Sequence, residues 1–146
     1  PHLTNSFMEN VMNKKWFILV AALALVLSTL ACGASAPAGV SNIYMANNEN
    51  GDNQTTTFAP TDDIYVFFDV NQVDNGTQFE IKWYALNVDG QDPSTPFTTS
   101  DYSYNGESTL YANITSTDSS GFPAAQYKVE IYMAGVKVGE QQFNVQ

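Results

Sequence analysis

Carboxylates are the only reactive side chains that this sequence has in quantity. Its 146 residues hold 15 acidic side chains against 5 lysines, no arginine, one histidine and one cysteine. Two carboxylates at a suitable separation can cleave glycosidic bonds. The candidates for such a pair are Asp62, Asp63, Asp69, Asp101 and Glu107. Their spacing singles out no pair, and acidic side chains are normally exposed. We therefore predict no catalytic residue and keep a small secreted hydrolase as an alternative.

Hard oxygen ligands also suit calcium, which extracellular modules bind weakly. The candidate ligands Asp69, Asn71 and Asp74 have a spacing similar to that of a calcium-binding loop, but Val73 stands where an EF-hand needs an oxygen donor. A hairpin turn is the simpler explanation of this segment. No metal and no cofactor is predicted, and weak calcium binding is kept as an alternative.

The charge and the scarcity of other reactive groups exclude several functions. The formal net charge is -10, and a chain this acidic is repelled by phosphate backbones, so nucleic acid is not expected as a partner. With His2 and Cys32 as the only histidine and cysteine, histidine general bases, zinc clusters and disulfide frameworks are largely excluded. From Cys32 onward, three lysines face fourteen acidic side chains, a net charge of -11.

Residues 12–31 have the three parts of a secretory signal peptide. Lys14 and Lys15 form a cationic start, residues 16–27 are apolar, and small residues follow. The uncharged stretch is shorter than the roughly 20 residues that a membrane-spanning helix needs. We expect a helical signal peptide here and regard residues 1–11 as an upstream or non-native extension.

The end of this segment, Ser-Thr-Leu-Ala-Cys at residues 28–32, resembles the lipobox of prokaryotic lipoproteins. Ala31 fits that pattern, whereas the family prefers leucine where Thr29 stands. The resemblance implies that Cys32 is lipidated and anchors the protein to the membrane, where two or more acyl chains give stable attachment. Cleavage to a fully secreted protein is the alternative. Residues 32–40 have no charged side chain and are expected to form a flexible tether.

Alternation of apolar and polar residues predicts the strands that must position these groups. Strong strands are expected at residues 64–70, 79–86, 108–114 and 127–133, and weaker ones at 41–46, 55–58 and 95–102. A last strand, 136–145, begins with apolar residues at even positions and ends with them at odd ones. This switch requires an extra residue, so we predict a bulge near Gly139 and Glu140.

Seven or eight strands without a helical period indicate an all-β antiparallel sandwich of two sheets over residues 41–146. The layout resembles the immunoglobulin-like domains of prokaryotic surface proteins. The resemblance depends on Trp83, which falls on the inward side of its strand, and on Tyr127, which begins the penultimate strand where such folds often have a tyrosine corner. The cysteine pair of antibody domains is missing.

Outward aromatic side chains are the candidate binding groups. If the strands at 79–86 and 127–133 are neighbours, as the resemblance implies, Tyr84, Leu86 and Tyr132 share an exposed face. Such faces bind glycans or partner proteins.

Three sequons are possible glycosylation sites, because they fit the acceptor pattern for N-linked glycans. They begin at Asn53, Asn75 and Asn113.

Together these features predict an exported, lipid-anchored, non-catalytic module of the cell envelope. Its expected role is binding or structural interaction with extracellular proteins or glycans. A carbohydrate-binding module and a small hydrolase with paired carboxylates are the alternatives.

Overall fold

The computed structural model describes residues 38–146 and forms an all-β sandwich from them. The expected signal peptide, Cys32 and most of the expected tether lie outside the described residues. The strands are β1 (Gly39–Ala46), β2 (Thr57–Phe58), β3 (Ile64–Asn71), β4 (Gln78–Ala85), β5 (Thr98–Ser103), β6 (Thr109–Ile114), β7 (Ala125–Met133) and β8 (Val136–Val145). β1 begins two residues before the domain start expected at residue 41. No helix in the described part of the chain is long and apolar enough to cross a bilayer.

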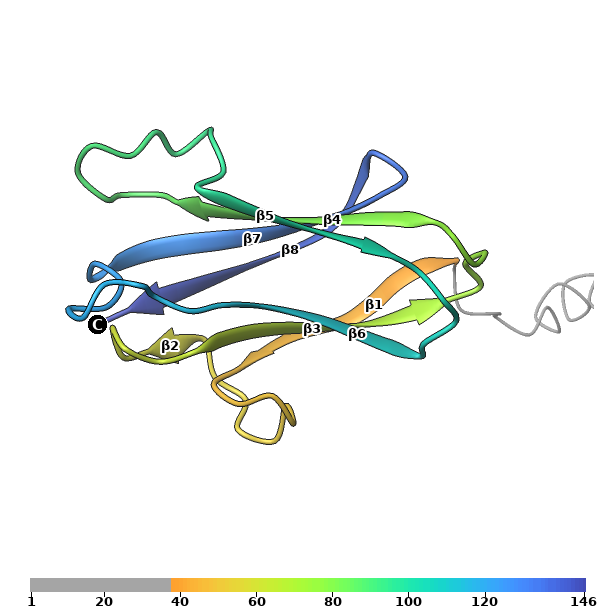
Figure 1. Ribbon diagram of the computed structural model, residues 1–146, viewed down its shortest axis with the longest axis horizontal. Helices are drawn as coiled ribbons and strands as arrows, with labels where there is room; N and C mark the ends of the chain where they lie inside the picture. The colour runs from red at the N-terminus through yellow and green to blue at the C-terminus, as the bar shows by residue number, and fades with distance from the viewer. Residues whose placement is uncertain (1–37) are drawn as a thin grey trace, which may run out of the picture. The chain divides into compact units, whose positions relative to one another are not determined.

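The strands form two sheets that face each other (Figure 1). One sheet has three strands in the order β1-β3-β6, and the other has five in the order β2-β8-β7-β4-β5. Neighbouring strands are antiparallel, except that Thr57 and Phe58 of β2 pair in parallel with β8. β2 is shorter than the expected strand at 55–58, because the Thr55 hydroxyl hydrogen-bonds to the backbone of Thr57 and makes a local turn. The predicted all-β, two-sheet architecture is confirmed.

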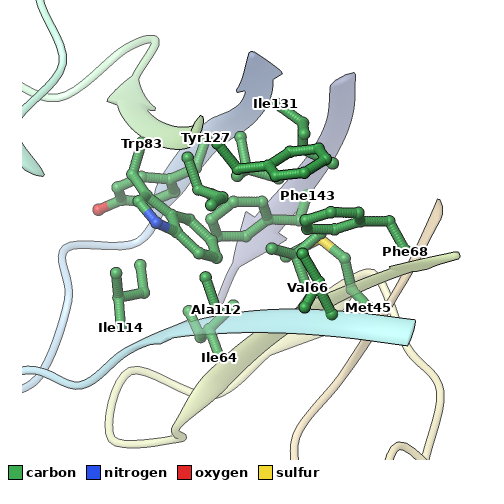
Figure 2. Packing of buried hydrophobic residues seen from close by; sticks show 14 of the residues in the cluster. Met45, Ile64, Val66, Phe68, Trp83, Ala112, Ile114, Tyr127, Ile131 and Phe143 are labelled. Atoms are coloured by element: carbon green, nitrogen blue, oxygen red, sulfur yellow. The ribbon is translucent and has the colours of Figure 1, made fainter. Parts of the chain in front are cut away.

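The core lies between the sheets and consists of the inward residues of each strand (Figure 2). In β6 the buried positions alternate as the sequence pattern predicts, because successive side chains of a strand point to opposite faces. In β3 they alternate as well, except that the outward Phe67 is also buried, at 5% exposed. The fully buried Trp83 lies edge to face with Phe143 at a centroid distance of 6.0 Å. Rings from the two sheets also meet directly, as Phe68 does with Phe79 at 5.8 Å.

Tyr127 forms the tyrosine corner that the sequence predicts. Its hydroxyl donates a hydrogen bond of 2.8 Å to the carbonyl oxygen of Pro123, four residues upstream. Its ring stacks on Phe143 at 5.4 Å. The contact fastens the entry of β7 to the core, as the corresponding tyrosine does in many sandwiches.

The predicted bulge is present in β8, slightly earlier than expected. Ile131 of β7 pairs with Gly139, whereas the next residue, Tyr132, pairs with Lys137. Val138 is therefore the extra residue, one position before the expected site. It shifts the parity of β8, so that Phe143 and Val145 point into the core.

The two ends of the sandwich differ. The β4–β5 loop, the β6–β7 loop and the C-terminus lie at one end, on the left in Figure 1. The start of β1 and the β7–β8 hairpin lie at the other end. Any chain segment that precedes Gly39 therefore joins the sandwich at the end opposite the β6–β7 loop.

Candidate functional site

The predicted binding face around Tyr84 and Tyr132 lies on the outer side of the five-stranded sheet. β4 and β7 are antiparallel neighbours, with Glu80 opposite Tyr132 and Tyr84 opposite Lys128. The strand pairing on which the prediction depends is therefore present. Leu86 follows the end of β4, is half-buried, and its backbone N–H donates to the carbonyl oxygen of Gln126 at 2.9 Å.

The expected exposure of this face is wrong for Tyr84, which is only 7% exposed. The Nζ atom of Lys128 lies 4.9 Å from the centroid of the Tyr84 ring, and that of Lys82 lies 4.3 Å from the centroid of the half-buried Tyr132 ring. Long lysine side chains cover apolar surface with their stems while the ammonium group stays hydrated. Parity places these tyrosines outward, but neighbouring lysines cover them. A binding role for this face stays a prediction.

Glu130 is the centre of this lysine-covered face. The residue is 6% exposed, and its carboxylate contacts Lys128 Nζ at 2.7 Å, Lys137 Nζ at 3.0 Å and the Tyr132 hydroxyl at 2.8 Å. Burial alone would raise the pKa of Glu130, but hydrogen bonds from these three groups lower it to about 2. Burial, followed by the nearby Glu130 carboxylate, raises the pKa of Tyr84 to about 12. The face is thus a closed network of charged and phenolic groups.

The five candidate carboxylates do not converge on one site. Asp62 accepts a bond from the Ala59 N–H at 2.9 Å, and Asp63 accepts one from the Thr115 hydroxyl at 2.7 Å. Asp101 belongs to β5 of the five-stranded sheet, where it pairs with Glu80 of β4. Asp69 and Glu107 likewise hold neighbouring side chains. Four of the five candidates, all except Asp101, therefore hydrogen-bond to neighbouring residues.

Hydrogen bonds lower the pKa of several carboxylates in the described part of the chain. A hydrogen bond from the Tyr102 hydroxyl lowers the pKa of Glu107. Bonds from Ser94 lower that of Asp92, and bonds from Ser120 lower that of Asp118. Glycosidases need one carboxylic acid whose pKa is raised. Every carboxylate of residues 38–146 with a shifted pKa has a lowered one.

The calcium candidates lie at the end of β3 and in the turn after it. Asp69 accepts hydrogen bonds from Asn42 at 3.0 Å and Thr109 at 2.7 Å, and Asn71 donates one to Ser41 at 2.8 Å. Asp74 is exposed, and its carbonyl oxygen accepts from Thr77. Among residues 38–146, no group of three or more His, Cys, Asp or Glu side chains is arranged to hold a metal. Calcium binding stays a prediction.

The three sequons occupy different surroundings. The Asn53 side chain donates to Asn47 Oδ1 at 2.6 Å within the β1–β2 loop. Asn75 is exposed in the β3–β4 turn, and Asn113 is exposed on β6. Glycosylation at these positions also stays a prediction.

Sequence reasoning missed an aromatic row on the outer face of the three-stranded sheet. Tyr44 stacks on Phe67 at 5.1 Å, and Phe67 lies 5.5 Å from Tyr111 and 6.2 Å from Tyr65. Glu49 of the β1–β2 loop accepts a bond from the Tyr111 hydroxyl at 3.0 Å, so the loop reaches over the row. Tyr111 is nevertheless 47% exposed. The sequence signal for this row was that its rings fall on the outward-facing positions of their strands.

The second missed feature is a hollow of about 590 Å³ at the end of the sandwich that carries the C-terminus. The start of β5 and the β6–β7 loop line it. Its apolar side chains are Phe97, Ile114 and Phe122, and its polar side chains include hydroxyl groups of the β6–β7 loop. No sequence signal brings these segments together, because they are about twenty residues apart and belong to different sheets.

Comparison with known proteins bears on the fold. No protein-family model matches the chain, and no curated protein matches it. A similar solved structure is an immunoglobulin-like protein from Pseudomonas aeruginosa, with a TM-score of 0.53, 15% identity, and coverage of 77% of this chain and 100% of that one. An alkylpurine DNA glycosylase from Pseudomonas fluorescens, bound to DNA with an abasic-site analogue, has a TM-score of 0.48 and 9% identity, over 82% of this chain and 33% of that one. At that TM-score the second likeness says nothing about function.

The first likeness, together with the strand order and the tyrosine corner, confirms the fold expected from the sequence. The described chain is an immunoglobulin-like β-sandwich.

Proposed function

We propose that this protein is a non-catalytic binding module of the cell envelope, exported by its signal peptide and anchored through lipidated Cys32. The observation that carries the proposal is the exposure of Phe97 and Tyr111, at 36% and 47%, on the outside of a well-packed sandwich. Solvent-facing aromatic rings on a rigid scaffold are typical recognition groups.

The arrangement of the ends supports a tethered module. Residues 32–40 carry no charged side chain and are the predicted tether, and the first strand of the sandwich begins at Gly39. The hollow beside Phe97 lies at the end of the sandwich opposite Gly39, where β1 begins. The net charge of -10 also disfavours direct contact with anionic headgroups.

Mass spectrometry of the mature N-terminus tests the anchor. We expect a diacylglyceryl-modified Cys32 and membrane fractionation of the wild type. Cys32→Ser should move the protein to the soluble fraction, whereas the nearby Ser35→Ala should not. An unmodified mature N-terminus at Gly33 or Ala34 would contradict the anchor and indicate a fully secreted protein.

Binding without turnover tests the module. The full chain, expressed in a bacterium and purified in mild detergent, is incubated with cell-envelope polysaccharide and protein fractions. Retention of the protein with unchanged polymer length supports a binding module. Shortening of a polysaccharide, abolished by substitution of a carboxylate such as Asp63→Asn or Glu107→Gln, would indicate the alternative hydrolase.

A further inference from the structure

The geometry points to the hollow beside Phe97 as a binding site for a neutral polysaccharide. This inference deepens the proposed function and rests on it, since it names the site and the ligand class of the same module. The hollow has a volume of about 590 Å³, within the range of roughly 300–1,000 Å³ that small-ligand sites occupy. Its lining divides into an aromatic floor and a hydroxyl-rich rim.

The aromatic floor is held rigidly by the core. The ring of Phe97 lies edge to face with Tyr127 at 6.1 Å, and that of Phe122 does so at 6.4 Å. The backbone N–H of Phe97 donates to the Trp83 carbonyl at 2.9 Å, and that of Phe122 donates to the Pro60 carbonyl at 2.8 Å. These contacts fix both rings before a ligand arrives, which lowers the entropy cost of binding. A pyranose ring has an apolar C–H face that can cover such rings.

The rim supplies groups that pair with sugar hydroxyls. Thr98, Thr115, Ser116, Thr117 and Ser120 contribute hydroxyls. The hydroxyls of Thr115, Ser116 and Ser120 already donate to Asp63 or Asp118, so they offer a ligand an acceptor only. The hydroxyls of Thr98 and Thr117 can both donate and accept. A sugar hydroxyl has the same double capacity.

Asp118 adds a charged acceptor to this rim. The Ser120 N–H and hydroxyl both bond to its Oδ1 atom, at 2.8 and 2.7 Å. Oδ2 is therefore available to a ligand on this exposed side chain. Ser120 also lowers the pKa of Asp118, so the group is ionised at neutral pH. Ionised acceptors form stronger hydrogen bonds than neutral ones.

Charge selects a neutral ligand over an acidic one. No lysine lines the hollow, and the lysines of residues 38–146 lie on β4, β7 and β8. Asp118 and the net charge of -10 repel phosphate and uronate groups.

The test is a polysaccharide array followed by calorimetry, with the full chain purified in mild detergent. The array holds neutral glucans, mannans, galactans and xylans beside uronate-containing polymers. We expect binding to at least one neutral polymer and weaker binding to the acidic ones. Phe97→Ala should weaken binding by about tenfold, since a stacked ring contributes on that scale. Asp118→Asn should weaken it severalfold while the hydrogen bonds to Oδ1 remain.

Two matched variants locate the site. Val136→Ala truncates an apolar side chain that is 65% exposed on the β7–β8 hairpin, at the other end of the sandwich, and should leave affinity unchanged. Tyr111→Ala removes the exposed ring of the aromatic row, the other candidate recognition surface, and a loss of polysaccharide binding in this variant alone would place the site on that row. A thermal unfolding curve for each variant separates loss of binding from loss of folding. If Phe97→Ala does not fold, the affinity of Asp118→Asn tests the site instead.

Failure of this inference is distinguishable from failure of the proposed function. Polysaccharide binding that survives Phe97→Ala and Asp118→Asn but is lost in Tyr111→Ala would overturn the site and keep the binding module. Preference for uronate polymers, or binding only to a protein fraction, would overturn the ligand class. Cleavage of the bound polymer would overturn the proposed function itself.

Discussion

Glu130 shows how a single side chain on a sandwich surface can become part of its stability. Parity places it outward on β7, where glutamate is normally hydrated. Lys128 and Lys137 reach over it from the same and the neighbouring strand, at 2.7 and 3.0 Å. The exposed pair between Lys82 and Glu80, at 2.9 Å, has no such enclosure. The Glu130 ion pairs therefore contribute more stability than the Glu80–Lys82 pair, because water screens the exposed pair.

Acid should weaken the protein through Glu130. Its pKa is 4.5 when unperturbed and about 2 in the folded state, so the stabilisation is complete above pH 4.5 and is lost as the pH falls toward 2. The linked free energy is about 3 kcal/mol. We expect Glu130→Gln to lower the free energy of unfolding by roughly this amount at pH 7. Urea denaturation between pH 7 and 2 measures it.

The control for this prediction is Glu80→Gln, which should change stability by less than about 0.5 kcal/mol. The unfolding free energy of Glu130→Gln should also fall less steeply than that of the wild type below pH 4.5. Equal acid sensitivity of the two proteins would contradict the assignment.

Tyr127→Phe should show the contribution of the tyrosine corner. The change removes the hydroxyl that donates to the Pro123 carbonyl and leaves the stacked ring in place. We expect a loss of about 1 kcal/mol, the usual contribution of one partly buried hydrogen bond. Denaturant titration measures the loss, and Tyr111→Phe, which removes an exposed bond to Glu49, should cost clearly less. Equal effects of the two changes would contradict a special role for the corner.

At the scale of elements, the β6–β7 loop depends on a close approach between distant backbone segments. Gly121 has φ +81°, and a Cβ atom there would lie 2.2 Å from the Pro60 carbonyl oxygen. The neighbouring Phe122 N–H donates to that same carbonyl. Only glycine therefore allows the loop to pack against the segment before β3, and this packing forms one wall of the hollow.

Gly121→Ala should be strongly destabilising. The left-handed φ angle costs about 1–2 kcal/mol for any L-residue, and the contact with the Pro60 backbone adds to that cost. Gly135→Ala is a matched control, because Gly135 has φ +80° with no atom within 4 Å of the added Cβ. Thermal denaturation of both variants gives the difference. If Gly121→Ala is no less stable than Gly135→Ala, the close approach to Pro60 is wrong.

At the scale of the whole molecule, one core joins the two sheets. Each sheet has an outer face that meets solvent or a loop and an inner face that is buried only by the other sheet. Phe68 of the three-stranded sheet and Phe79 of the five-stranded sheet meet across it. Neither sheet can keep its inner face dry alone, because burial of apolar surface is the main stabilising contribution.

The sandwich should therefore unfold in one cooperative step. Far-UV circular dichroism, which reports both sheets, and the fluorescence of Trp83, recorded in a Trp16→Phe background, should give coincident thermal transitions. Loss of fluorescence at a clearly lower temperature than loss of strand signal would show that the sheets separate before they unfold.

Local sequence determined much of the fold. Alternation identified the strong strands, because side chains on a strand point alternately to its two faces. The change of parity between Val136 and Phe143 revealed the bulge, and the inward position of Trp83 identified it as core. Each of these inferences depends only on residues within one strand, so no knowledge of partner strands was needed.

The candidate site required the tertiary structure. Tyr84 is outward by parity but buried by Lys128 from another strand, and Tyr44, Phe67 and Tyr111 form one row only because β1, β3 and β6 are neighbours. The hollow beside Phe97 likewise depends on two loops that meet at one end of the sandwich. Composition and periodicity determined that the chain is acidic and that residues 38–146 form an all-β sandwich, whereas the export signal stays a prediction. Which outward side chains stay exposed was decided by packing between distant segments, since burial depends on neighbours that sequence spacing does not specify.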